Sequence, residues 1–176
     1  AAAQRCGLMA LRFRNVDASP TDDVTTWPYE GLVAAIDRGL VPDWQPIFAE
    51  VRRAPWGSVA RRVERYLSYR PHDGVSRLFE LAVARARDDA DSLDRAEVAR
   101  RVRAAIDASG TTAAQFAELV GTSPSRLSTY ARGKVTPSAA MLLRIERQAR
   151  LSSAAAGDEG AAVVGDDVAH REGAGP

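Results

Sequence analysis

Apolar residues recur at helical spacing along most of this chain, and no segment shows the alternation that is typical of a half-buried strand. The first half predicts four helices: one that starts at Thr26 and Pro28 and ends at Gly39, one that starts at Asp43 and Pro46, one that follows Pro55, and one over about 73–87. Their apolar faces carry Leu32, Val33 and Ile36, then Ile47 and Val51, then Val59, Val63, Tyr66 and Leu67, and finally Val75, Leu78, Phe79 and Ala82. We therefore expect an all-α chain with a helical domain over residues 25–88.

Three tryptophans, Trp27, Trp44 and Trp56, stand at helix entries beside proline. A large ring at such a junction can pack across two helices, so core packing is the favoured interpretation and a ligand pocket or partner groove is the alternative. Between Thr21 and Asp94 the sequence has thirteen acidic residues and ten arginines, which makes this domain a poor surface for DNA. Its expected role is dimerisation, sensing or binding of a protein partner.

A second helical domain is expected over residues 94–150. Asp94 can cap its first helix with Glu97 as capping-box partner, and Val98, Val102, Ala105 and Ile106 form the buried stripe of that helix. The acidic run 88–92 joins the two domains, or else it lets the preceding helix continue almost into the next one.

Two short helices then lie about three residues apart. Thr112 can cap the first helix while Gln115 reaches back, and Gly121 falls where a helix commonly ends in a left-handed conformation. Ser123 and Pro124 start the second helix as cap and first residue. The apolar residues that join the pair are Phe116, Ala117, Val120, Leu127 and Tyr130; a last helix opens at Ser138 with Leu142, Ile145 and Ala149 on one face. This spacing is that of a helix-turn-helix.

Glu97 to Arg150 resembles the XRE/Cro-type, phage-repressor-like helix-turn-helix family. The residues that carry the resemblance are Ala117, Gly121, Ser123, Leu127, Ser128, Tyr130, Arg132, Gly133 and Lys134, with Pro137 and Ser138 opening the next helix. The resemblance implies a four-helix DNA-binding domain whose recognition helix, about 124–131, enters the major groove. Many relatives carry Gln where Ala113 and Pro124 stand, so the DNA sequence that they bind cannot be carried over.

Because Leu127 and Tyr130 face inward, other side chains of the recognition helix point outward. Those expected to contact bases are Ser125, Arg126 and Thr129; those expected to contact phosphates are Ser123, Ser128, Arg132, Lys134 and Ser138. Arg126 can donate two hydrogen bonds to guanine O6 and N7, which makes it the expected principal base contact. The alternative is that Arg126 touches only phosphate or water.

The formal net charge of +1 hides an uneven distribution. Residues 95–150 contain ten arginine or lysine residues against four acids, whereas residues 151–176 contain Arg171 against five acids. The basic surplus therefore coincides with the helix-turn-helix, as a phosphate-binding surface requires. A solvated arginine face, such as Arg100 and Arg101, accounts for part of it.

The two ends of the chain, the cysteine and the histidines give no indication of a membrane segment, a metal site or catalysis. Residues 1–24 and the acidic tail 151–176 are expected to be disordered, and the apolar stretch from Leu8 to Leu11 is too short for a membrane span or a secretory core. One cysteine and no export signal predict a cytoplasmic, nucleoid-associated protein. Cys6, His72 and His170 cannot assemble a metal site or a nucleophile-base pair, so we expect no enzyme, metal or cofactor.

Two functions follow from these patterns. The first is a sequence-specific transcriptional regulator that binds double-stranded DNA, expected as a homodimer. The second is an antitoxin-type interaction protein, which would bind a partner protein through residues 25–88 and repress its own promoter.

Overall fold

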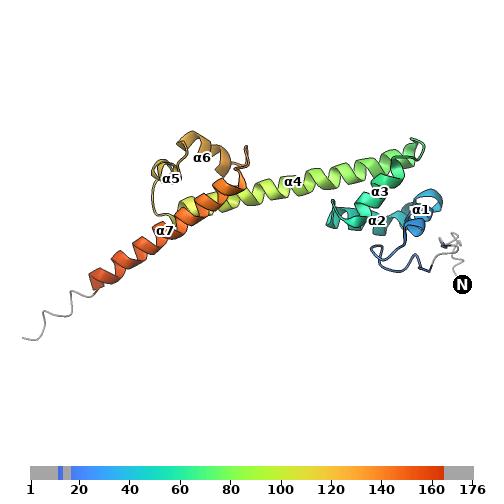
Figure 1. Cartoon of the computed structure of the whole chain (residues 1–176), viewed down its shortest axis with the longest axis horizontal. Coiled ribbons are helices and arrows are strands. Elements are labelled where there is room, and N and C mark those ends of the chain that lie inside the picture. The colour runs from blue at the N-terminus through green and yellow to red at the C-terminus, as the bar shows by residue number, and fades with distance from the viewer. Residues whose placement is uncertain (1–11, 14–16, 165–176) are drawn as a thin grey trace, which may run out of the picture. The chain divides into compact units, whose positions relative to one another are not determined.

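The computed structural model describes residues 12–13 and 17–164, and this part of the chain contains seven helices and no strand (Figure 1). The all-α prediction is therefore confirmed. The chain divides into two compact units, Ala1–Asp91 (unit 1) and Ser92–Pro176 (unit 2), each with its own hydrophobic core. One helix, α4, contributes its first part to unit 1 and its second part to unit 2.

The helices have the following bounds. Unit 1 contains α1 (Tyr29–Arg38), α2 (Val41–Arg53), α3 (Ser58–Leu67) and the first part of α4 (Gly74–Ala108). Unit 2 contains the remainder of α4, then α5 (Ala113–Leu119), α6 (Pro124–Ala131) and α7 (Ala139–Val164).

Two of the three tryptophans belong to the core of unit 1, as predicted. Trp27 and Trp44 are buried, and their indole N–H groups donate to the Asp22 and Ala35 carbonyl oxygens at 3.0 and 2.9 Å. Trp56 lies in the turn before α3 and remains 48% exposed, so the prediction of core packing is wrong for this residue. Neither buried indole leaves its polar group unpaired, which burial would otherwise penalise.

Two details of unit 1 differ from the sequence prediction. Helix α2 begins at Val41 because Asp43, expected at its start, acts from within the first turn and accepts a hydrogen bond from the Leu40 N–H at 2.8 Å. On α4, Leu78 is exposed, and the buried stripe consists of Phe79, Val83 and Ala86. The α4 stripe is thus rotated from the predicted one, because Leu78 and Phe79 are adjacent and only one can face the core.

The expected disorder of residues 1–24 is wrong in part. Residues 17–24 form turns in which Ser19 and Asp22 hydrogen-bond to each other, and Val24 is buried in the core. The Phe13 ring also meets Trp27 edge-on, with 5.1 Å between ring centroids. Residues 1–11 and 14–16 lie outside the described residues.

Helix α4 is continuous from Gly74 to Ala108, so the predicted helix start at Asp94 is wrong and the alternative of a continued helix is right. No glycine or proline occurs between residues 75 and 108, and the aspartates of the acidic run lower helix propensity only modestly. The Arg85–Asp89 ion pair at 3.1 Å spans one helical turn in this region. Asp94 is an exposed residue within the helix.

Helix α7 extends to Val164, well past the expected end near Arg150. Its alanine-rich sequence after residue 150 favours a helix even without core contacts. Ala149 is buried, whereas Leu151 is 59% exposed and no side chain from residue 151 to 155 is buried. Residues 165–176 lie outside the described part of the chain.

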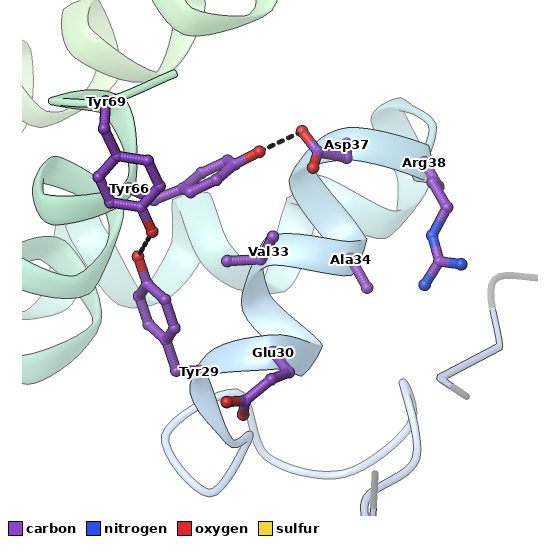
Figure 2. A pocket seen from close by; sticks show the side chains of 8 residues that line it. All are labelled: Tyr29, Glu30, Val33, Ala34, Asp37, Arg38, Tyr66 and Tyr69. Carbon is purple, nitrogen blue, oxygen red and sulfur yellow. Dashed lines mark hydrogen bonds between the residues drawn. The ribbon is translucent and has the colours of Figure 1, made fainter. Parts of the chain in front are cut away.

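A hollow of about 550 Å³ opens between α1 and the end of α3 (Figure 2). Val33 and Ala34 of α1 are the apolar residues of its lining, and Tyr66 and Tyr69 lie opposite Val33. The Tyr66 hydroxyl donates to Asp37 Oδ1 at 2.5 Å, and the Tyr29 and Tyr69 hydroxyls hydrogen-bond to each other. These bonds tie α1 to the end of α3.

We expect unit 1 to lose stability in alkali through Tyr66. Burial, together with the hydrogen bond to Asp37, raises the pKa of Tyr66 from 10.0 to about 12. Below pH 10 the Tyr66 phenol is neutral in both the folded and the unfolded protein, and its full contribution to the free energy of unfolding is present. As the pH rises from 10 toward 12 the phenol ionises first in the unfolded state, and that contribution is lost. The free energy of unfolding measured in urea should fall less between these pH values for Tyr66→Phe than for the wild type. Parallel pH profiles of the two proteins would contradict this expectation.

Candidate helix-turn-helix interface

The start of α5 carries the predicted capping box. The Gln115 N–H donates to Thr112 Oγ1 at 3.3 Å, and the Thr112 N–H donates to Gln115 Oε1 at 3.0 Å. These reciprocal bonds satisfy two backbone donors that the helix itself cannot pair. Their effect is to fix the first residue of α5, and with it the position of the following turn.

The turn between α5 and α6 is built around Gly121, as predicted. Gly121 has φ +73°, a left-handed conformation that a side chain would resist. The Thr122 N–H returns to the Ala117 carbonyl oxygen at 2.9 Å, which closes the end of α5. Ser123 Oγ then accepts from the Arg126 N–H at 3.2 Å and caps α6, with Pro124 as its first residue. The predicted caps of both helices are therefore confirmed.

A buried core fixes α6 against the other helices of unit 2. The core side chains are Val102, Ala105, Phe116, Ala117, Val120, Leu127, Tyr130, Ile145 and Ala149. Ala99 is buried on α4, whereas the predicted Val98 is only half-buried. Since Leu127 and Tyr130 face this core, the opposite side of α6 is presented to solvent.

The three predicted base contacts lie on that outer side. Ser125 and Arg126 are exposed and Thr129 is half-buried. Arg126 Nε donates to the Tyr130 hydroxyl at 2.9 Å, and Thr129 Oγ1 donates to the Arg126 carbonyl oxygen at 2.7 Å. The Tyr130 bond occupies only one of the five N–H donors of the guanidinium, so a bidentate contact to a base remains available.

The predicted phosphate contacts lie at both ends of α6 and at the start of α7. Ser123 and Ser138 are exposed caps, and Ser138 Oγ accepts from the Met141 N–H at 3.2 Å. Arg132 and Lys134 are exposed beyond the end of α6, and Ser128 is half-buried on it. A positive φ of 68° at Gly133 reverses the chain between the two cations.

Three arginine contacts were not predicted from the sequence. Arg103 Nη1 on α4 donates to the Ala131 carbonyl oxygen at 2.5 Å, and Arg144 Nη1 on α7 donates to the Val120 carbonyl oxygen at 3.4 Å. Arg101 forms an ion pair with Glu146. These contacts join helices that are far apart in sequence, so no local spacing pattern could have indicated them.

Other kinds of site find little support in the part of the chain that the structure describes. It contains no cluster of His, Cys, Asp and Glu with the geometry of a metal site. None of its helices combines the length and the apolar character needed to span a bilayer.

Comparison with known proteins identifies one segment. A family model described as helix-turn-helix matches residues 102–153, which comprise α5, α6 and the adjoining parts of α4 and α7. This segment is therefore a helix-turn-helix domain of the XRE type, a DNA-binding and regulatory family rather than an enzyme family. No curated protein and no solved structure matches the chain.

Proposed function

We propose that this helix-turn-helix domain makes the protein a sequence-specific transcriptional regulator, with α6 inserted in the major groove of double-stranded DNA. The outward side of α6 carries the proposal, because Ser125, Arg126 and Thr129 stand over a fully buried Leu127. Side chains on a rigid helix of this kind can contact base edges, whereas the same residues on a mobile loop would have no fixed position relative to the base pairs.

Phosphate contacts at the ends of α6 would set the position of that helix on DNA. Arg132 and Lys134 supply charge beyond its C-terminal end, and the Ser123 cap lies where backbone N–H groups point outward. The basic surplus of residues 95–150 supports this assignment. Binding of the chromosome would make the protein nucleoid-associated.

We further propose that the regulator acts as a homodimer. Leu119, Val135, Leu143 and Leu151 are large apolar side chains of unit 2 that remain about half exposed or more. A second copy could cover such residues, and it would place two recognition helices about one turn of DNA apart, roughly 34 Å. The expected operator is then partly palindromic.

The second candidate function, an antitoxin-type interaction protein, rests on a different observation. Unit 1 exposes several large apolar side chains, namely Leu40, Val41, Trp56, Leu78 and Leu81. Exposed apolar residues of this size suit a protein partner, although single ones are ordinary on any surface. An adjacent gene for a small toxin-like protein that co-purifies with this chain would favour this candidate.

The test is selection of bound sites by the full-length protein from a random pool of double-stranded DNA. We expect an enriched, partly palindromic motif whose half-sites are separated by about 10 base pairs, and an affinity that falls steeply with salt. Absence of binding at low salt, both to the pool and to the promoter of its own gene, would contradict both candidate functions.

A further inference from the structure

A basic hollow of about 340 Å³ lies within unit 2, between α4 and the turn that follows α6. Three arginines line it, Arg95 and Arg103 from α4 and Arg132 from the turn. Its remaining lining is small, with Ser92, Ala96, Ala99 and Gly133, and none of these described residues is acidic. The hollow therefore concentrates positive charge around a space that bulky side chains leave open.

Two contacts hold the walls of this basic hollow in place. Arg103 Nη1 donates to the Ala131 carbonyl oxygen at 2.5 Å, which ties α4 to the C-terminal end of α6. A Cβ at Gly133 would lie 3.5 Å from Ala99 Cβ, so the turn rests directly on α4. Gly133 also has φ +68°, a conformation that most side chains would strain. The fold thus fixes the Arg103 side chain and the position of the turn that carries Arg132, while Arg95 Nη2 donates to Ser92 Oγ at 3.4 Å.

The hollow continues the DNA-facing side of α6. Ser125, Thr129 and Arg132 follow one another at spacings of four and three residues, so they share one face of the helix. Helix α6 has eight residues, or about 12 Å of length, which is close to the width of the major groove. A helix that spans the groove in this way brings the residues just beyond its end to the sugar-phosphate backbone.

We infer that the basic hollow binds a phosphate group of the DNA backbone, with Arg95 and Arg103 of α4 as contacts outside the helix-turn-helix itself. Guanidinium groups bind phosphate oxygens through paired N–H donors, and a space lined by three of them and by no acid suits an anion. The inference rests on the proposed function. It adds a second anchor, about one helix length from the α6 cap, which would set the tilt of α6 in the groove.

The experiment compares Arg95→Gln with Arg100→Gln in the full-length protein. Both residues are exposed arginines on the same stretch of α4, but Arg100 lies outside the hollow and pairs with Glu97 at 2.6 Å. The two variants lose the same formal charge. Affinity for the selected site is measured over a range of salt concentrations, together with affinity for a scrambled duplex.

For Arg95→Gln we expect weaker binding of both duplexes and a salt dependence, log K against log[salt], whose slope is smaller by about 1. Arg100→Gln should keep the wild-type slope. Equal slopes for the two variants would overturn the inference while leaving the proposed function intact, whereas a wild-type protein that binds no DNA would remove both. Tighter DNA binding by Arg95→Gln would also overturn it, since the loss of a phosphate contact should weaken binding.

Discussion

Replacing Phe116 with alanine is expected to unfold the DNA-binding domain while unit 1 remains folded. Phe116 is fully buried in the unit 2 core, to which Val102, Leu127 and Ile145 of three other helices also belong. Truncation of a buried phenylalanine costs about 3–5 kcal/mol, because the lost ring leaves a cavity that the neighbours fill only partly. A small domain has little more stability than this to lose.

The positions of the tryptophans allow the two units to be followed separately. Trp27, Trp44 and Trp56 all belong to unit 1, so tryptophan fluorescence reports that unit, while DNA binding reports unit 2. Phe116→Ala should abolish DNA binding and leave the fluorescence-detected urea transition near its wild-type midpoint. Leu93→Ala is the matched control, because Leu93 is also an apolar residue of unit 2 and is 71% exposed. A Phe116→Ala protein that binds DNA like the wild type would contradict the assigned core.

Replacing Arg126 with alanine is expected to relax base preference at one position of each half-site. Arg126 is exposed near the start of α6, and its Nε bond to the Tyr130 hydroxyl at 2.9 Å orients the guanidinium along the helix. A bidentate contact to guanine O6 and N7 is worth about 1–3 kcal/mol of discrimination, or roughly 5- to 150-fold in affinity at that base pair. Nonspecific binding should change much less.

Site selection with the Arg126→Ala protein measures this effect directly, as the loss of a conserved guanine from the enriched motif. Lys134→Ala is the useful comparison, since a lost phosphate contact should weaken all sequences alike. Tyr130→Phe should weaken the preference for guanine partly, because the Arg126 side chain loses its partner but keeps its donors. An enriched motif that is identical for Arg126→Ala and the wild type would show that Arg126 touches only the backbone or solvent.

Features set by neighbouring residues could be predicted from the sequence. The Thr112–Gln115 capping box, the left-handed Gly121 and the Ser123 cap each depend on a few consecutive side chains, and all three occur as expected. Their chemistry is local, so the spacing of residue types was sufficient evidence. The family match to residues 102–153 agrees with this part of the prediction.

Features that depend on competition between local signals were harder to predict. The sequence around Asp94 contains the residues that commonly cap a helix start, yet α4 continues through it. A capping side chain stabilises a helix only where backbone N–H groups lack a partner, and within a continuous helix they are already paired. Trp56 lies next to a proline at a helix start, as Trp27 does, but its turn leaves the ring at the surface. In both cases tertiary context outweighs a sound local pattern.

The basic hollow could not be predicted at all from spacing. Arg103 reaches the Ala131 carbonyl oxygen across 28 positions of sequence, and Arg95 lies farther still from Arg132. Arginine is the commonest charged residue of the chain, so its presence on α4 suggested only a solvated face. Only the folded arrangement of α4 and the turn after α6 distinguishes these arginines from the others.

The hydroxyl of Thr129 has a consequence for the bases that can lie opposite it. Threonine usually both donates and accepts hydrogen bonds, but here its single proton is held by the Arg126 carbonyl oxygen at 2.7 Å. The Thr129 oxygen can therefore only accept hydrogen bonds from bases in the major groove. Adenine and cytosine present amino groups there, whereas guanine and thymine present acceptors. The backbone of α6 thus gives Thr129 a fixed polarity, and we expect an amino-bearing base at its position in the operator.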